Sequence, residues 1–193
     1  MAKKMEDRPT AAQVETELRR VKYRRDYRRA LRGTIYALII VAAVSVLVAT
    51  LWLPVLRIYG SSMTPTLRDG DIVVSLKGSD FHQGEVVAFY YNNKILVKRV
   101  IASAGDWVDI DEEGTVSVNG QVLSEPYLAE KSLGECDIEL PYQVPDGRWF
   151  VMGDHRSVSV DSRSSTVGCV AQEQIVGRLV FRVWPLSAFG EMS

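Results

Sequence analysis

Three separated stretches of this sequence concentrate side chains suited to nucleophilic or acid–base chemistry. The first is residues 60–67, Gly-Ser-Ser-Met-Thr-Pro-Thr-Leu, which cannot form a regular helix or central strand because Pro65 lacks a backbone donor. The second is the pair Lys98-Arg99 inside an apolar run. The third is residues 153–163, Gly-Asp-His-Arg-Ser-Val-Ser-Val-Asp-Ser-Arg. Together they offer serine hydroxyls as nucleophiles and lysine or histidine as bases.

Lys98 is the most informative of these side chains. Residues 95–101 read as a strand, in which neighbouring side chains point to opposite faces, so either Lys98 or Arg99 must approach the core. Burying an unpaired ammonium disfavours its charged form. Lowering the lysine pKa by ~3 units from ~10.4 corresponds to roughly 4 kcal/mol, and it yields a neutral amine that can act as a base. The alternative, in which both cations reach solvent through flexible stems, stays open.

Histidine is the other candidate base. His82 lies in a Ser-Asp-Phe-His-Gln-Gly loop that we expect at the surface, whereas His155 lies in the third stretch and could serve a Ser-His pair. Two scattered histidines and the distant Cys136 and Cys169 do not make a metal site, so we expect neither metal nor cofactor. The two cysteines either pair or remain ordinary thiols, and the sequence favours the second.

Charge is distributed unevenly along the 193 residues, although the net charge is only −1. Residues 1–32 carry 11 Lys/Arg and 5 Asp/Glu, whereas residues 33–193 carry 12 and 19. An acidic body argues against nucleic acid as a partner. We expect residues 1–9 to be disordered and a helix to begin at the Thr10–Gln13 capping box. The basic residues 19–32 are expected to lie against anionic lipid headgroups.

Residues 33–55 contain no charged side chain and are predicted to form one transmembrane helix. At ~1.5 Å per residue they reach roughly 34 Å, enough to cross a ~30 Å hydrocarbon core. Trp52 and Pro54 suit an interface anchor and a helix stop. Because the basic flank precedes the span, the N-terminus is expected in the cytoplasm and residues 57–193 on the other side. We therefore divide the chain into segments 1–32, 33–55 and 56–193.

Residues 56–193 have a sequence pattern that is typical of an all-β domain. Short runs rich in β-forming residues are bounded by Gly, Asn and Asp, and Asn92-Asn93 and Asn119-Gly120 suggest hairpin turns. These runs predict antiparallel sheets curved into a sandwich or open barrel. Residues 124–148, with three prolines, are expected to be an irregular excursion, and a turn is expected near 172–174. The predicted strands are residues 71–75, 85–91, 95–101, 107–110, 115–118, 121–123, 149–152 and 177–184.

The order of a spanning helix, Gly-Ser-Ser-Met-Thr-Pro-Thr-Leu, Val-Lys-Arg-Val-Ile-Ala-Ser-Ala-Gly-Asp and the third stretch resembles the bacterial type I signal peptidases. The resemblance covers about residues 34–185. It implies a plasma-membrane serine endopeptidase with a Ser/Lys dyad, which removes signal peptides from exported preproteins after an Ala-x-Ala pattern. It also implies an extracytoplasmic catalytic domain of the signal-peptidase type.

The resemblance assigns roles residue by residue. It implies Ser62 as the nucleophile, Lys98 as the general base and Met63 as a residue beside the substrate cleft. The Ser62 backbone N–H is implied as an oxyanion donor. Supporting residues come from the third stretch: Ser159, which orients the lysine, Asp161 and Arg163, which form an ion pair, and Asp154 and Arg156, which have a structural role.

Two positions depart from the family pattern. Some members place a serine hydroxyl two residues before the nucleophile, where this chain has Gly60, as in forms typical of Gram-positive bacteria. His155 stands where the family usually has Asn. The short excursion also suggests the compact Gram-positive form. Relatives of the endoplasmic-reticulum type carry His in place of Lys98, so this chain resembles the lysine form.

Two other functions fit parts of the sequence. A maturation peptidase of a conjugation-pilus system would share similar boxes, whereas the self-cleaving repressors that also share them are soluble and lack a span such as 33–55. A non-enzymatic alternative is a membrane-anchored β-domain that binds exported chains through a silent site. The sequence leaves the oligomeric state and the preferred preproteins open.

Overall fold

The computed structural model describes residues 11–78 and 80–192 and divides into two compact units, Met1–Val48 and Ala49–Ser193. The expected disordered start and the first residue of the Thr10 capping box lie outside the described residues.

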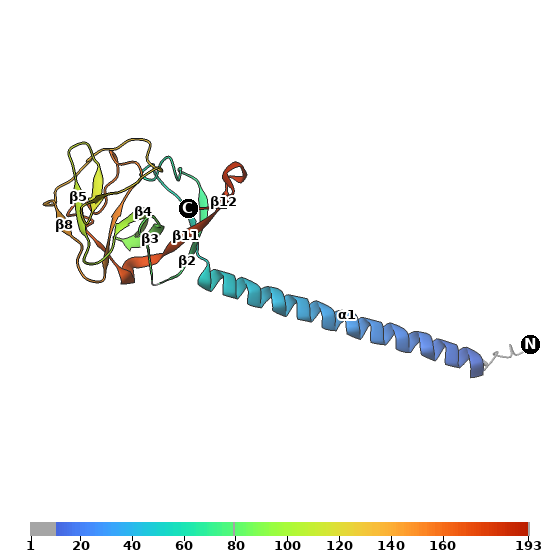
Figure 1. Cartoon of the computed structure of the whole chain (residues 1–193). Coiled ribbons are helices and arrows are strands. Elements are labelled where there is room, and N and C mark those ends of the chain that lie inside the picture. The colour runs from blue at the N-terminus through green and yellow to red at the C-terminus, as the bar shows by residue number, and fades with distance from the viewer. Residues whose placement is uncertain (1–10, 79, 193) are drawn as a thin grey trace, which may run out of the picture. The chain divides into compact units, whose positions relative to one another are not determined.

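One helix, α1 (Ala11–Trp52), makes up the described part of the first unit and ends at Trp52 in the second (Figure 1). The basic segment and the uncharged segment thus form one continuous helix, which the sequence left undecided. By length and composition it can cross a membrane. The helix ends three residues before the predicted boundary at Val55, because Pro54 cannot donate the next helical hydrogen bond.

The second unit is built from antiparallel strands, as predicted, and its larger sheet has the order β1-β2-β11-β3-β4-β9-β10, with β12 added beside β11. A smaller sheet has the order β7-β6-β5-β8. The strands of the larger sheet are β1 (Val55–Arg57), β2 (Ile72–Leu76), β3 (Val86–Tyr91), β4 (Lys94–Ala102), β9 (Arg148–Met152), β10 (Val170–Ala171), β11 (Ile175–Trp184) and β12 (Gly190–Glu191). Those of the smaller sheet are β5 (Trp107–Ile110), β6 (Val116–Val118), β7 (Gln121–Val122) and β8 (Tyr142–Gln143).

All eight predicted strands are present, with ends that differ by at most two residues. Asn92 and Asn93 both have positive φ, 44° and 62°, as a two-residue hairpin between twisted strands requires. The turn expected near 172–174 is a short 3-10 helix, η1 (Gln172–Gln174), and a second one is η2 (Leu186–Ala188). The sequence reading missed β1, β8, β10 and β12, which have two or three residues each.

Three apolar clusters form the core, and one of them fixes the first chemical stretch. Met63 and Leu67 are 2% and 0% exposed and pack in a cluster with Ile58, Val73 and neighbouring strand residues. A second cluster joins β5 and β6 of the smaller sheet to β9 of the larger one. The irregular excursion contributes β8 to the smaller sheet, so it is joined to the part of the domain that this second cluster holds together.

Candidate active site

Ser62 lies on a tight loop that leads out of β1. Its neighbour Met63 is buried, and the amide of Leu67 donates to the carbonyl of Met63 at 2.8 Å, so the loop is closed by its own backbone. Gly60 has φ of 87°, a conformation that favours glycine. Ser62 itself is only partly buried. The hydroxyl is therefore held on a rigid loop at the edge of the core.

The third stretch packs directly on this loop. The amide of His155 donates to the carbonyl oxygen of Ser62 at 3.0 Å. At Gly153 a Cβ would lie 2.2 Å from Oγ of Ser159 and 2.6 Å from the Ser62 carbonyl oxygen, closer than atoms can approach. Only glycine fits between these two serines. The structure thus brings Ser62 and Ser159, nearly a hundred residues apart in sequence, against the same face of Gly153.

Lys98 is 3% exposed and, among the described residues, takes part in no ion pair. Burial lowers the pKa of Lys98 from 10.5 to about 8. The carboxylates of Asp161 and Asp154 raise this pKa, and the guanidinium of Arg163 lowers it further. The charges that act on Lys98 therefore all come from the third stretch. A pKa near 8 leaves a substantial fraction of neutral amine at neutral pH.

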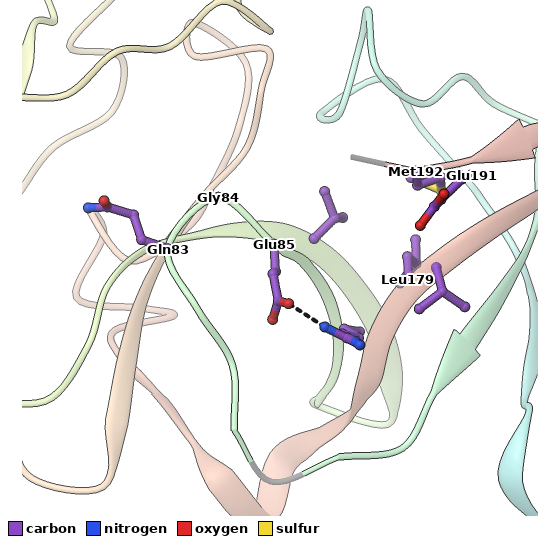
Figure 2. A pocket seen from close by; sticks show the side chains of 9 residues that line it. Gln83, Gly84, Glu85, Leu179, Glu191 and Met192 are labelled. Carbon is purple, nitrogen blue, oxygen red and sulfur yellow. Dashed lines mark hydrogen bonds and ion pairs between the residues drawn. The ribbon is translucent and has the colours of Figure 1, made fainter.

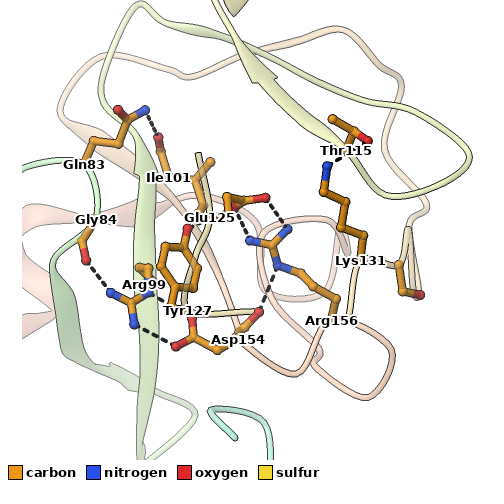
Figure 3. Close-up of polar contacts among 12 residues, drawn as sticks. Gln83, Gly84, Arg99, Ile101, Thr115, Glu125, Tyr127, Lys131, Asp154 and Arg156 are labelled. Carbon is orange, nitrogen blue, oxygen red and sulfur yellow. Dashed lines mark hydrogen bonds and ion pairs between the residues drawn. The ribbon is translucent and has the colours of Figure 1, made fainter. Parts of the chain in front are cut away.

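The burial of Lys98 confirms that one of the two cations approaches the core, and Arg99 is buried as well, with 2% exposure. The reason is a buried partner. Nε and one terminal nitrogen of Arg99 donate to the two carboxylate oxygens of Asp154 at 2.9 and 2.7 Å (Figure 3). A bidentate pair offsets much of the cost of removing both charges from water. Asp154 also accepts from the hydroxyl of Thr66, on the Ser62 loop.

Asp161 and Arg163 form the ion pair that the resemblance implies, at 2.8 Å and fully buried. The hydroxyl of Ser159 donates to Asp161 at 2.7 Å, and the amide of Gly153 donates to the same oxygen at 2.9 Å. Because the Ser159 proton is directed at Asp161, its oxygen remains an acceptor for a donor such as a lysine amine. Arg163 also donates to four backbone carbonyls, those of Ser132, Leu133, Arg156 and Ser159.

Arg156 is fully buried and donates through Nε to the carbonyl of Gly153 at 3.1 Å. Its terminal nitrogens bind Glu125, a carboxylate from the excursion that the sequence reading did not identify. Tyr127 was missed as well, although its ring lies 3.9 Å from the Arg99 guanidinium carbon (Figure 3). Both contacts join residues more than 25 positions apart, so no local sequence pattern indicates them.

The two histidines differ in their surroundings. His82 has a side chain that is 77% exposed, as predicted for a surface loop. Nδ1 of His155 lies 3.0 Å from Oγ1 of Thr64, whose single hydroxyl proton is donated to the carbonyl of Ser61. This contact ties the imidazole ring to the loop that carries Ser62.

A groove of about 600 Å³ opens beside Ser62. It is lined by residues 55–60, Ser62, Met63 and residues 94–97. The pairing of β4 explains why the groove is open. Residues 94–99 of β4 pair with β3, whereas β9 pairs with β4 only from Arg99 onward. The other edge of residues 94–98 therefore has no strand partner among the described residues. Met63 is one of the residues that line this groove.

A second pocket, of about 410 Å³, lies between the 83–86 segment, β11 and residues 191–192 (Figure 2). An ion pair between Glu85 and Arg178 crosses it. None of the predicted site residues lines this pocket. In the described part of the chain no group of three or more His, Cys, Asp or Glu side chains could hold a metal ion. Cys136 and Cys169 are both free thiols.

Comparison with known proteins gives one consistent family. The family described as "Signal peptidase, peptidase S26" matches residues 31–184. Signal peptidase IB of Staphylococcus aureus (strain COL) is 39% identical over 152 residues, covering 68% of this chain and 78% of the relative. Signal peptidase I of Bacillus licheniformis is 32% identical over 164 residues, covering 78% and 87%.

A crystal structure of a signal peptidase I from Enterococcus faecalis V583 is 29% identical, with a TM-score of 0.45, and covers 52% of this chain and 97% of that one. The match to the family spans the uncharged part of α1, the Ser62 loop, β4 and the third stretch. This chain belongs to the signal peptidase family, peptidase S26.

Proposed function

We propose that this protein removes N-terminal signal peptides from exported preproteins, with Ser62 as nucleophile and Lys98 as general base. The observation that carries the proposal is a buried lysine that has no ion-pair partner in the described part of the chain. Its pKa is lowered to about 8, and it lies on a strand whose free edge borders the groove that contains Ser62. Serine hydroxyls are weak nucleophiles and need a nearby base, and a neutral amine can fill that role.

The proposed reaction begins with attack of Ser62 Oγ on the scissile carbonyl carbon, while Lys98 Nζ takes the hydroxyl proton. The oxyanion accepts from the Ser62 backbone N–H. The protonated lysine then gives its proton to the leaving amine, which frees the mature protein and leaves the signal peptide as an ester on Ser62. Water, deprotonated by the same amine, hydrolyses that ester and restores the serine.

Residues of the third stretch support the base in this proposal. The Ser159 oxygen can accept from the lysine, because its own proton is directed at Asp161. Arg163 holds Asp161 through two of its nitrogens, at 2.8 Å each. Arg163 also opposes Asp161 electrostatically at Lys98, so the carboxylate does not return the lysine pKa to its ordinary value. Asp154 and Arg156 have structural roles, through their contacts with Arg99 and Gly153.

Substrate binding uses the groove. An extended preprotein segment adds to the free edge of residues 94–98 by backbone hydrogen bonds. The groove wall from Leu56, Ile58, Ile95 and Val97 is apolar and accepts small residues ahead of the scissile bond, the Ala-x-Ala type of site. His155 is not the base in this scheme, because its ring is hydrogen-bonded to Thr64 and, among the described residues, makes no hydrogen bond to the Ser62 hydroxyl.

Membrane residence completes the proposal. α1 crosses the plasma membrane once, with the N-terminus in the cytoplasm and the β-domain outside, because the basic residues precede the uncharged segment. Arginines of residues 19–32 contact anionic headgroups on the cytoplasmic side. A shared membrane raises the effective concentration of enzyme and preprotein.

The test is cleavage of a preprotein with an Ala-x-Ala site by the detergent-solubilised full chain. Wild type is expected to cleave after the second alanine, and Ser62→Ala and Lys98→Ala are expected to have no measurable turnover. His155→Ala is expected to retain turnover. Binding of the preprotein by wild type without cleavage would instead indicate a silent binding domain, and turnover that depends on His155 rather than Lys98 would exclude the dyad.

A further inference from the structure

The excursion, residues 124–148, contacts the site through side chains that the resemblance does not assign. Its first turn supplies Glu125 and Tyr127, which meet two buried arginines of the β-domain, Arg156 and Arg99 (Figure 3). We propose that Glu125 and Tyr127 are positioning residues, which hold these arginines and through them the loops that carry Ser62 and Ser159. This inference rests on the proposed function, because the reaction it serves is the cleavage at Ser62.

Glu125 acts on the Ser62 loop through Arg156. Its side chain is 1% exposed, and its two carboxylate oxygens accept from both terminal nitrogens of Arg156. Nε of Arg156 donates to the carbonyl of Gly153, the residue that is wedged between Ser159 and the Ser62 carbonyl. A shift of Arg156 therefore moves the Gly153 backbone, against which both serines pack.

Tyr127 acts on β4 through Arg99. Its ring covers the guanidinium at 3.9 Å, a favourable cation–π distance. The same guanidinium is held in its plane by Asp154, which also accepts from Thr66 on the Ser62 loop. Arg99 directly follows Lys98 on β4. Tyr127 thus fixes the orientation of the side chain beside the proposed base.

One hydrogen bond links the two residues. The Tyr127 hydroxyl donates to Glu125 at 2.9 Å. Burial and the Glu125 carboxylate raise the pKa of Tyr127 well above its usual range, so the hydroxyl remains a donor throughout the pH range of an assay. Glu125 accepts from both Arg156 and Tyr127, and it connects the two arginine sites into one network.

The energetics make this network sensitive to a single deletion. Arg99 and Arg156 are 2% and 0% exposed, and each has one carboxylate partner. Removing one partner of a buried ion pair leaves an uncompensated charge, which the chain relieves by moving that side chain toward water. For Arg156 this movement breaks its bond to Gly153. The expected result is a misplaced nucleophile in an otherwise folded protein.

The experiment compares Glu125→Gln, Tyr127→Leu and Tyr127→Phe in the detergent-solubilised full chain. Glu139→Gln and Tyr142→Phe are the matched controls, since both lie in the same excursion and neither contacts Arg99 or Arg156. A 1 Å misplacement can cost 10²-fold in rate, so Glu125→Gln and Tyr127→Leu are expected to lower kcat by about tenfold or more, with KM within about twofold. Tyr127→Phe keeps the ring over Arg99 and is expected to stay within about threefold of wild type.

Amide hydrogen exchange supplies a readout that needs no catalysis. The amides of Gly153 and His155 donate to Asp161 and to the Ser62 carbonyl, so both are expected to be protected in wild type. Glu125→Gln is expected to raise their exchange rates, and the two control variants are expected to leave them unchanged. A kcat equal to wild type in Glu125→Gln and Tyr127→Leu, or a change in KM alone, would overturn the inference.

The two proposals fail separately. If wild type does not cleave the preprotein, the proposed function fails, and the exchange measurement decides whether the excursion positions the Ser62 loop. Faster exchange at Gly153 and His155 in Glu125→Gln would support the network, and unchanged exchange would overturn it. If wild type cleaves and the variants match it, only the positioning role is lost.

Discussion

Lys98 and Arg99 are neighbours on one strand and both are almost fully buried, but their partners differ. Arg99 has a carboxylate at hydrogen-bond distance, whereas Lys98 has none among the described residues. Arginine holds its proton in nearly any setting, so a buried arginine demands a partner. Lysine can lose its proton instead, which is why the unpaired member of the pair is the one proposed as the base.

The pH dependence of cleavage follows from the Lys98 pKa of about 8. Only the neutral amine can accept the Ser62 proton, so kcat/KM is expected to rise with pH and level off above about pH 8. Steady-state cleavage of a preprotein between pH 6 and 10 checks this. A rate that falls through the same range would rule out a neutral lysine as the base.

The same lysine is expected to lower the stability of the fold. Because its folded pKa is below the unfolded value, the cost of burying the ammonium is fully present below about pH 8 and fades as the pH approaches 10.5. Lys98→Met is expected to raise the free energy of unfolding at pH 7 by up to about 3 kcal/mol, the equivalent of this pKa difference.

Thermal unfolding of the detergent-solubilised protein, followed by near-UV circular dichroism, measures that effect. The gain of Lys98→Met over wild type should shrink between pH 7 and pH 10. A variant less stable than wild type at pH 7 would show that Lys98 is held by an interaction that offsets its burial.

At the scale of elements, the site depends on how closely the third stretch approaches the Ser62 loop. Gly153 is the point of contact, and a methyl group there would overlap Ser159 and the Ser62 carbonyl. Gly153→Ala is expected to lower the free energy of unfolding by about 1–3 kcal/mol. The cleavage rate is expected to fall by more than this loss of stability alone explains. Gly78→Ala is the control, because nothing lies within 4 Å of the added carbon. Equal activity of the two variants in the cleavage assay would contradict this.

The longer strands were predictable because each carries its own run of β-forming residues, as in Val86–Tyr91 or Ile175–Trp184. β1, β8, β10 and β12 have too few residues to leave such a signal, and they are defined by the strands beside them. Their existence depends on tertiary pairing, which a single sequence does not display.

The site was predictable to a similar degree. The three stretches were found because each gathers polar residues within about ten positions, and their order resembles one family. Glu125 and Tyr127 were missed because their partners are distant in the sequence. Arg156 lies 31 residues after Glu125, and Arg99 lies 28 residues before Tyr127. The burial of Arg99 was also missed, since only the fold brings Asp154 to it.

At the scale of the whole molecule, charge changes in sign along the chain, from one continuous helix to the residues that follow it. A basic segment, an uncharged segment and an acidic β-domain follow one another, which predicts a fixed orientation in the membrane. This orientation can be measured with cysteines. Cys169 is buried, and burial raises its pKa to about 11, so it is expected to be inert to maleimides.

Single exposed cysteines introduced into a Cys136→Ser background test the orientation. Glu139→Cys in the β-domain is expected to react with a membrane-impermeant maleimide in intact cells. Ala12→Cys in α1 is expected to react only after the membrane is permeabilised. Mass spectrometry of the labelled chain reads out both positions. Labelling of Ala12→Cys in intact cells would reverse the proposed topology.

The free edge of residues 94–98 has a consequence for the breadth of the substrate repertoire. A strand edge contacts amide and carbonyl groups, which every polypeptide shares, so most of the binding energy is independent of side-chain identity. Exported proteins could then diversify without co-evolving with the enzyme, provided that they keep an extended segment with small residues near the cut. Under the proposed function, one enzyme with this mode of binding would accept many different exported proteins.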